Sequence, residues 1–173
     1  MAKALIVIDM QNDFVTGALG TKEAQEMLPR LVEKLEAAAA DEFVDIIFTQ
    51  DTHKENYLET QEGKNLPVEH CIKNTAGWDI VPELKKFLPR AKAVIEKKAF
   101  GSTRLPSLIK PYELVEFVGV CTDICVVSNA LLVKAFYPEQ VVAVDASCCA
   151  GTTPENHRAA LTVMKLCQCK IEE

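Results

Sequence analysis

A chain of 173 residues with 49% hydrophobic residues has the size of one globular domain and can bury a sizeable core. Its net charge of −6, with lysine and arginine scattered along the chain, argues against a nucleic acid or an anionic membrane surface as its partner. The first apolar run ends at the carboxylate of Asp9, sooner than an export signal or a membrane span would. We therefore expect a single domain, residues 1–173, in the cytoplasm.

Short apolar runs rich in valine and isoleucine, without alternation, predict strands that are buried on both faces. These runs are Ala4–Ile8, Asp45–Thr49, Ala93–Ile95, Leu114–Val118 and Val141–Val144, with a last short strand at Cys167–Ile171. Helical patterns lie at Thr21–Ala40, Asp79–Phe87, Ile124–Phe136 and Pro154–Leu166. Strands that alternate with helices predict a three-layer α/β/α sandwich with a mainly parallel sheet. Two stretches, Asp51–Gly77 and Phe100–Pro111, fit neither pattern.

Reactive side chains follow four of the predicted strands. Asp9 follows the first strand, Asp51 and His53 the second, Lys97 the third, and a turn containing Cys125 the fourth. In open parallel sheets, ligands bind beyond the carboxyl ends of the strands. We therefore expect these side chains to share one site.

Seven cysteines in a chain without an export signal argue against a disulfide framework, and the absence of a C-x-x-C pair argues against a structural zinc knuckle. Most of them fit the pattern of small buried hydrophobic residues. Cys125 differs because it follows a strand and a tight turn, at the start of a helix. The helix dipole favours a thiolate there, and the amides of the turn can bind an oxyanion.

A thiol with an ordinary pKa of about 8.5 needs a base or a cation to ionise at neutral pH. Asp9 is placed to accept the thiol proton and to pass it to a leaving amine. Lys97 is placed to keep that carboxylate ionised and to favour the thiolate. On position alone, a helix cap for Asp9 and a surface charge for Lys97 stay open as alternatives.

Three segments in order, Ala4–Phe14, Val94–Phe100 and Gly119–Val126, together resemble the isochorismatase-like cysteine hydrolase superfamily, and in particular its nicotinamidase and pyrazinamidase branch. The resemblance runs from Lys3 to the C-terminus. It implies a cysteine hydrolase that releases ammonia from a small carboxamide, with nicotinamide as the expected substrate in NAD salvage. It also implies a homo-oligomer.

The resemblance assigns a catalytic triad of Asp9, Lys97 and Cys125. Lys97 is chosen over Lys98 because the lysine of the family lies three residues before an aromatic, here Phe100.

The resemblance further implies a cis peptide bond between Val120 and Cys121, with the backbone amides of Cys121 and Cys125 directed at the oxyanion. Phe14 and Phe100 are expected to contact the substrate, and Tyr57 and Leu66 are further candidates for an apolar wall.

A second cluster suggests a metal. Asp51 and His53 lie two residues apart and His70 follows in an irregular loop, a donor set that suits zinc, iron or manganese. By spacing alone, solvated loop histidines remain an alternative. The resemblance matches these three residues to the metal ligands of nicotinamidases, and it matches Glu62 to an acidic position that reaches the metal directly or through water. Zinc is the expected ion, and it would bind the pyridine nitrogen.

Two departures from the branch bear on the substrate. Leu66–His70 contains no aromatic residue before the last histidine, and the stretch between Lys97 and Cys125 is short. The main alternative is therefore a metal-independent amidase of the same superfamily that acts on an N-carbamoyl or ureido compound. A non-catalytic binding module and a redox sensor using Cys148 and Cys149 are further alternatives, and His157 is expected to be structural.

Overall fold

The computed structural model describes residues 2–110 and 112–173. Met1, the first residue of the predicted domain, and Pro111, the last residue of the second unassigned stretch, lie outside the described residues. No helix within these two ranges is long and apolar enough to cross a membrane.

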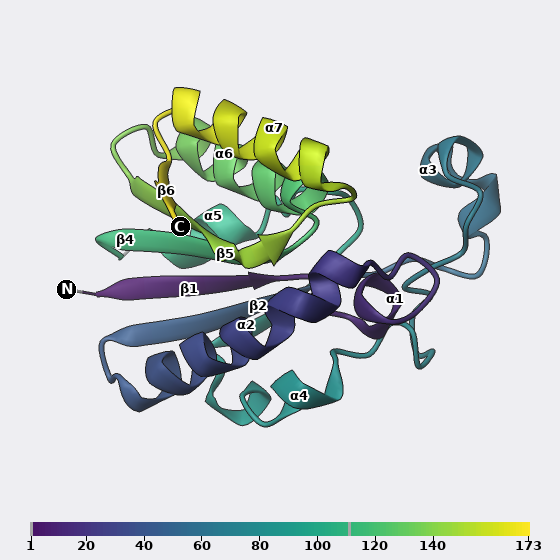
Figure 1. Ribbon diagram of the computed structural model, residues 1–173, viewed down its shortest axis with the longest axis horizontal. Coiled ribbons are helices and arrows are strands. Elements are labelled where there is room, and N and C mark those ends of the chain that lie inside the picture. The colour runs from purple at the N-terminus through teal and green to yellow at the C-terminus, as the bar shows by residue number, and fades with distance from the viewer. Residues whose placement is uncertain (1, 111) are drawn as a thin grey trace.

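Six parallel strands form one sheet with the order β3-β2-β1-β4-β5-β6, and helices cover both of its faces (Figure 1). The strands are β1 (Lys3–Ile8), β2 (Val44–Asp51), β3 (Ala93–Lys97), β4 (Leu114–Val120), β5 (Val141–Ala150) and β6 (Lys170–Glu172). The α-helices are α1 (Asn12–Val15), α2 (Lys22–Ala40), α3 (Gln61–Asn65), α4 (Pro82–Lys85), α5 (Leu105–Ile109), α6 (Val127–Phe136) and α7 (Pro154–Leu166). Short 3₁₀ turns lie at Tyr57–Glu59 and Leu88–Arg90. The predicted three-layer sandwich is confirmed.

Alternate residues of β1 belong to the two halves of the core, since successive side chains of a strand point to opposite faces. Leu5 and Val7 pack with α2 and α4, whereas Ala4, Ile6 and Ile8 pack with α5, α6 and α7. All five are essentially inaccessible to water. The unbroken apolar run of β1 is therefore the signature of a central strand covered on both faces.

Strand β1 ends at Ile8 as predicted, but β2 to β5 extend further at their carboxyl ends than the apolar runs predict. Asp51 and Lys97 are the last residues of β2 and β3 and are register partners in the ladder. The prediction stopped too early because it followed apolar residues, whereas backbone pairing continues into the polar residues of the site. β3 is also an edge strand whose Val94 is exposed, so the expectation of burial on both faces was wrong there.

Two predicted helices begin or end elsewhere. The helix expected at Asp79–Phe87 is shorter than predicted and comprises α4 alone. Ile80 pairs with Gln11 in an extended bridge, and Pro82 then starts the helix. The helix expected at Ile124–Phe136 starts later than predicted. Its first three residues belong to a wide π-helical turn, Thr122–Val126, and α6 begins only at Val127.

The last strand is also shifted relative to its prediction at Cys167–Ile171. The end of α7 is closed by a hydrogen bond from the Cys169 N–H to the Met164 carbonyl, and Gln168 adopts a positive φ of 69°. Because these residues close the helix, β6 starts only at Lys170.

Chain order and strand order together define where a ligand should bind. The chain moves outward from β1 to β2 and β3, then returns to β4 on the other side of β1. The carboxyl ends of β1 and β4 therefore flank a topological switch point, which is where open parallel sheets bind ligands. In Figure 1, α1 and α3 lie at this end of the sheet.

Candidate active site

Lys97 is the centre of a buried cluster at the switch point. Its Nζ lies 2.7 Å from Asp9 Oδ2 and 3.0 Å from Asp51 Oδ1, and it contacts Cys125 Sγ at 3.3 Å and the Ala99 carbonyl at 3.1 Å. Lys97 is only 3% exposed, and Asp9 and Cys125 are also buried. The structure thus brings together the three residues expected to form a triad, and it adds Asp51 to their surroundings.

Burial and charge act against each other in this cluster. Burial raises the pKa of Asp9, and the opposing effect of Lys97 does not cancel it. Burial alone would lower the pKa of Lys97, but the carboxylates of Asp9 and Asp51 raise it well above its ordinary value. Burial and the nearby Asp9 also raise the pKa of the Cys125 thiol. The resting cluster therefore pairs a protonated lysine with a protonated thiol, next to a carboxylate of increased proton affinity.

Asp9 has one oxygen available to a new proton. Its Oδ1 accepts a hydrogen bond from the Thr49 hydroxyl at 2.6 Å. Its Oδ2 is buried and pairs with Lys97 Nζ, which also contacts Cys125 Sγ. A carboxylate oxygen in this position can accept a proton from the thiol beside it.

The turn that carries Cys125 fits tightly against β1. Gly119 has a φ of 109°, and a Cβ at this position would lie 2.2 Å from the Ile8 carbonyl oxygen, so only glycine fits there. The next peptide bond, Val120–Cys121, is cis, as the resemblance implies. Cys121 and Cys125 both line the cavity described below, and burial raises the pKa of the Cys121 thiol to about 12.

Four side chains converge next to this cluster in an arrangement that can hold a metal ion. One ligand atom from each of Asp51, His53, Glu62 and His70 lies within 4.8 Å of the others. His53 Nε2 is 2.9 Å from Asp51 Oδ2, and Glu62 Oε1 is 3.6 Å from the Nε2 atom of each histidine. Burial would raise the pKa of Asp51, but hydrogen bonds with the two histidines and the charge of Lys97 keep it well below its usual range.

The surroundings of the histidines orient them toward this common point. His70 donates its Nδ1–H to the Val68 carbonyl at 2.8 Å, since a carbonyl can only accept, and Nε2 is left toward the carboxylates. Tyr57 is fully buried and packs edge-on against both histidine rings, with ring centroids 4.8 and 5.0 Å away. Two imidazoles and one or two carboxylates fit the donor set of a divalent transition metal.

A cavity of about 780 Å³ connects the two clusters, and its lining includes Cys125 and Asp51. Phe14 and Phe100, the residues expected to contact a substrate, both line it. Leu66 lines it as well, but Tyr57 lies behind the histidines instead. The apolar part of the wall therefore includes Phe14, Phe100 and the aliphatic Leu66, together with Leu19 and Ile124.

Three supporting residues escaped the sequence reasoning. Thr49 bonds Asp9, the side-chain amide of Gln11 makes two hydrogen bonds to the backbone of Asp51, and Asp13 accepts from the Cys71 N–H at 2.8 Å. Gln11 and Asp13 lie directly beyond Asp9 in the chain, which is the signal that could have identified them. No signal in the sequence identified Thr49, because it lies inside an apolar strand.

His157, expected to be structural, lies behind the turn that carries Cys125. Its Nδ1 is 2.7 Å from the hydroxyl of Thr122, and burial lowers its pKa.

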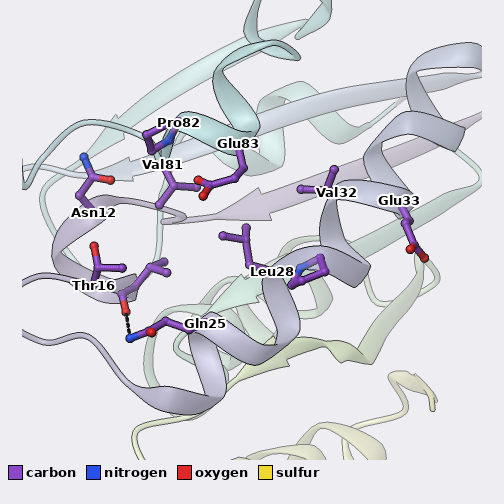
Figure 2. Close-up of a pocket in the computed structure, with 11 residues that line it drawn as sticks. Asn12, Thr16, Gln25, Leu28, Val32, Glu33, Val81, Pro82 and Glu83 are labelled. Atoms are coloured by element: carbon purple, nitrogen blue, oxygen red, sulfur yellow. Dashed lines mark hydrogen bonds between the residues drawn. The ribbon is translucent and has the colours of Figure 1, made fainter.

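A separate cavity of about 750 Å³ lies between α1, α2 and the start of α4 (Figure 2). Leu28 and Val32 line it, and Gln25 donates to the Val15 carbonyl at its edge. Its lining includes none of the residues expected to be catalytic or metal-binding.

The fold and the site define a class: a three-layer α/β/α protein with a carboxylate–lysine–thiol cluster at its switch point, beside a possible metal-binding group. An isochorismatase domain family model matches residues 3–172, and the chain belongs to this family.

Named relatives refine this assignment. The chain is 30% identical to the uncharacterized isochorismatase family protein PncA of Bacillus subtilis, over 94% of this chain and 93% of that protein. It is 28% identical to the nicotinamidase/pyrazinamidase of Mycobacterium tuberculosis, over 74% and 76%. The relatives identify the chain as a hydrolase acting on amide carbon–nitrogen bonds.

Solved structures agree with the fold. The pyrazinamidase of Pyrococcus horikoshii in complex with zinc is similar with a TM-score of 0.83 and 30% identity, over 100% of this chain and 99% of that one. The N-carbamoylsarcosine amidase of Thermoplasma acidophilum has a TM-score of 0.81 at 23% identity, over 100% and 96%, which shows a common fold alone.

Proposed function

We propose that this protein hydrolyses nicotinamide, or a closely related ring carboxamide, to the acid and ammonia through a thioester on Cys125. The observation that carries the proposal is the position of Lys97 Nζ, which contacts both Asp9 and Cys125. Of these residues, Cys125 lines the cavity. A cation in contact with both the base and the nucleophile stabilises the negative charge on either one, so neither the carboxylate before the proton transfer nor the thiolate after it is an unpaired buried charge.

In the first half of the reaction, Asp9 takes the proton of the Cys125 thiol and Lys97 stabilises the resulting thiolate. The sulfur attacks the amide carbon, and the backbone amides of Cys121 and Cys125 hold the oxyanion. Asp9 then gives the proton to the nitrogen, the carbon–nitrogen bond breaks, and ammonia leaves.

In the second half, Asp9 removes a proton from a water molecule, which attacks the thioester. The carbon–sulfur bond breaks, the acid is released, and the proton returns to the sulfur of Cys125. The nucleophile and the base are thereby restored.

Asp51, His53 and His70, with Glu62 beside them, are the residues that would hold a divalent metal ion. Zinc is supported by the donor set, and by the relative solved in complex with zinc. When bound, such an ion supplies a positive charge that attracts a ring nitrogen of the substrate. Phe14 and Phe100 then pack against the ring, and the carboxamide faces Cys125.

A second candidate is an amidase for N-carbamoyl or ureido compounds. The aliphatic Leu66 at the wall and the exposed Lys98 at the rim favour it, because the cavity can accept a substrate that is not a flat ring and carries an anionic group.

Ammonia release from nicotinamide, pyrazinamide, N-carbamoyl and ureido compounds tests both candidates. The full chain is purified without chelator, its metal content is measured, and each compound is assayed with and without chelator. Turnover of nicotinamide that chelator removes supports the first candidate. Chelator-resistant turnover of a carbamoyl compound alone would replace it with the second.

The proposal places this activity in one domain, residues 1–173, acting as a homo-oligomer. Size-exclusion chromatography with light scattering tests the oligomer, and a monomer at assay concentration would contradict it.

A further inference from the structure

Thr49 is fully buried in β2 and makes two contacts with Asp9. Its hydroxyl is 2.6 Å from Asp9 Oδ1 and 3.2 Å from the Asp9 backbone nitrogen. We propose that Thr49 is a positioning residue, which fixes the Asp9 carboxylate so that Oδ2 is the oxygen that exchanges the proton with Cys125. This inference rests on the proposed function, since it assigns a role within that reaction.

The hydrogen-bonding capacity of the hydroxyl decides which oxygen remains for the proton. A threonine hydroxyl has one proton, and its acceptor at 2.6 Å is Oδ1. The oxygen of the same hydroxyl accepts from the Asp9 N–H. Oδ1 is thereby occupied by the hydroxyl, whereas Oδ2 faces Lys97 Nζ, which also contacts Cys125 Sγ.

The backbone of Asp9 needs such an anchor. Asp9 has a φ of 47°, in the left-handed region that L-residues rarely adopt. Thr49 contacts both the backbone and the side chain of Asp9, and these two contacts fix the position of Asp9 relative to β2. Without them, the carboxylate could rotate about its side-chain bonds and exchange its two oxygens.

Strand geometry extends this role to the whole cluster. Thr49 and Asp51 are two residues apart in β2, so their side chains point to the same face of the strand. Thr49 holds Asp9, and Asp51 contacts Lys97. One strand therefore positions both the base and the cation that lie beside Cys125.

Thr49→Val tests the proposal because it keeps the shape of the side chain and removes the hydroxyl. Thr49→Ser restores the hydroxyl without the methyl group, and Thr162→Val is the matched control on the exposed face of α7. Two readouts are taken: steady-state ammonia release, and the rate of iodoacetamide alkylation at Cys125, resolved from the other six cysteines by mass spectrometry. The alkylation rate reports thiolate formation without any substrate.

We expect Thr49→Val to lower kcat about 10- to 100-fold, a part of the contribution of general acid–base catalysis, with KM nearly unchanged. Alkylation of Cys125 should slow as well, while Thr49→Ser and Thr162→Val stay close to wild type. In an Asp9→Asn background, Thr49→Val should have no further effect on alkylation, because the hydroxyl acts through Asp9.

Wild-type kcat and alkylation in Thr49→Val, or an equal loss in Thr49→Ser, would overturn the proposal. If the valine variant does not fold, Thr49→Ala is measured with the same two readouts. A wild-type chain that is inactive on every amide, but whose Cys125 alkylation slows in Thr49→Val, would refute the proposed function and leave the positioning role intact.

Discussion

Glu116 in β4 and Asp9, directly after the neighbouring strand β1, are buried carboxylates that each contact lysine. Glu116 has two lysines, with Lys3 Nζ at 2.6 Å and Lys34 Nζ at 2.9 Å. Burial would raise its pKa, but hydrogen bonds from the two lysines lower it below the ordinary value. Asp9 shares its single lysine, Lys97, with other groups, and burial leaves its pKa raised.

The difference teaches what separates a structural ion pair from a reactive one. A carboxylate with two lysines stays ionised and stabilises the fold. A carboxylate that shares one lysine with a thiol has a higher proton affinity, and it lies where a proton has to move. The two carboxylates therefore predict different responses to the same kind of substitution.

The largest effect is expected at the thiol, which only the Asp9 cluster has. Cys125→Ala should lower kcat by about 10⁴-fold or more, because no thioester can form. Ammonia release by the full chain measures the loss. Cys167→Ala, which removes an exposed thiol, is the control and should retain full activity. Activity of Cys125→Ala within tenfold of wild type would exclude Cys125 as the nucleophile.

A matched pair of carboxylate-to-amide substitutions tests the comparison directly. Asp9→Asn should lower kcat about 10²- to 10⁴-fold, since it removes the general base. Glu116→Gln should leave kcat unchanged and lower the free energy of unfolding by about 1–3 kcal/mol, less than a fully buried pair would lose because Lys3 and Lys34 are partly exposed. Kinetics and urea denaturation of both variants provide the measurements.

If Glu116→Gln loses as much activity as Asp9→Asn, the distinction between a structural and a reactive carboxylate fails.

Loss of the metal should have a smaller effect than loss of the base. His53→Ala should reduce the bound metal and lower kcat/KM about 10- to 100-fold, mainly through KM, because the ion would hold the substrate in the proposed reaction. Elemental analysis and steady-state kinetics are the measurements, and chelation of the wild type followed by added zinc is the control. Unchanged kcat/KM in a metal-free variant would show that the reaction does not require the metal.

The smallest effect concerns acid stability. Because the pKa of Glu116 is lowered on folding, its contribution is complete above its ordinary value of 4.5 and is lost as the pH falls through the folded value. The difference in unfolding free energy between wild type and Glu116→Gln should therefore be constant above about pH 5.5 and shrink below about pH 4.5. Urea titrations between pH 3 and pH 7 measure it. A difference that grows in acid would contradict the lowered pKa.

The sequence predicted the sheet well where local chemistry and tertiary context agree. β1 is apolar from Ala4 to Ile8 because both of its faces are covered, and the start of α7 follows from a capping Thr153 and the first-turn Pro154. The prediction was poorer at β3, an edge strand, and at Asp79–Phe87, where pairing of Ile80 with Gln11 delays the start of the helix to Pro82. In both places a distant segment decides the local structure.

For the site, the sequence alone determined which reactive residues end the strands: Asp9, Asp51, Lys97 and the turn of Cys125. Chain order and strand ends are local properties, and they bring these side chains to one edge of a parallel sheet. Only the tertiary structure decided how they share their charges. Lys97 contacts two carboxylates and a thiol, and Thr49 occupies one oxygen of Asp9. Hydrogen bonds between residues 28 to 46 positions apart depend on packing to within a fraction of an ångström, which no local pattern encodes.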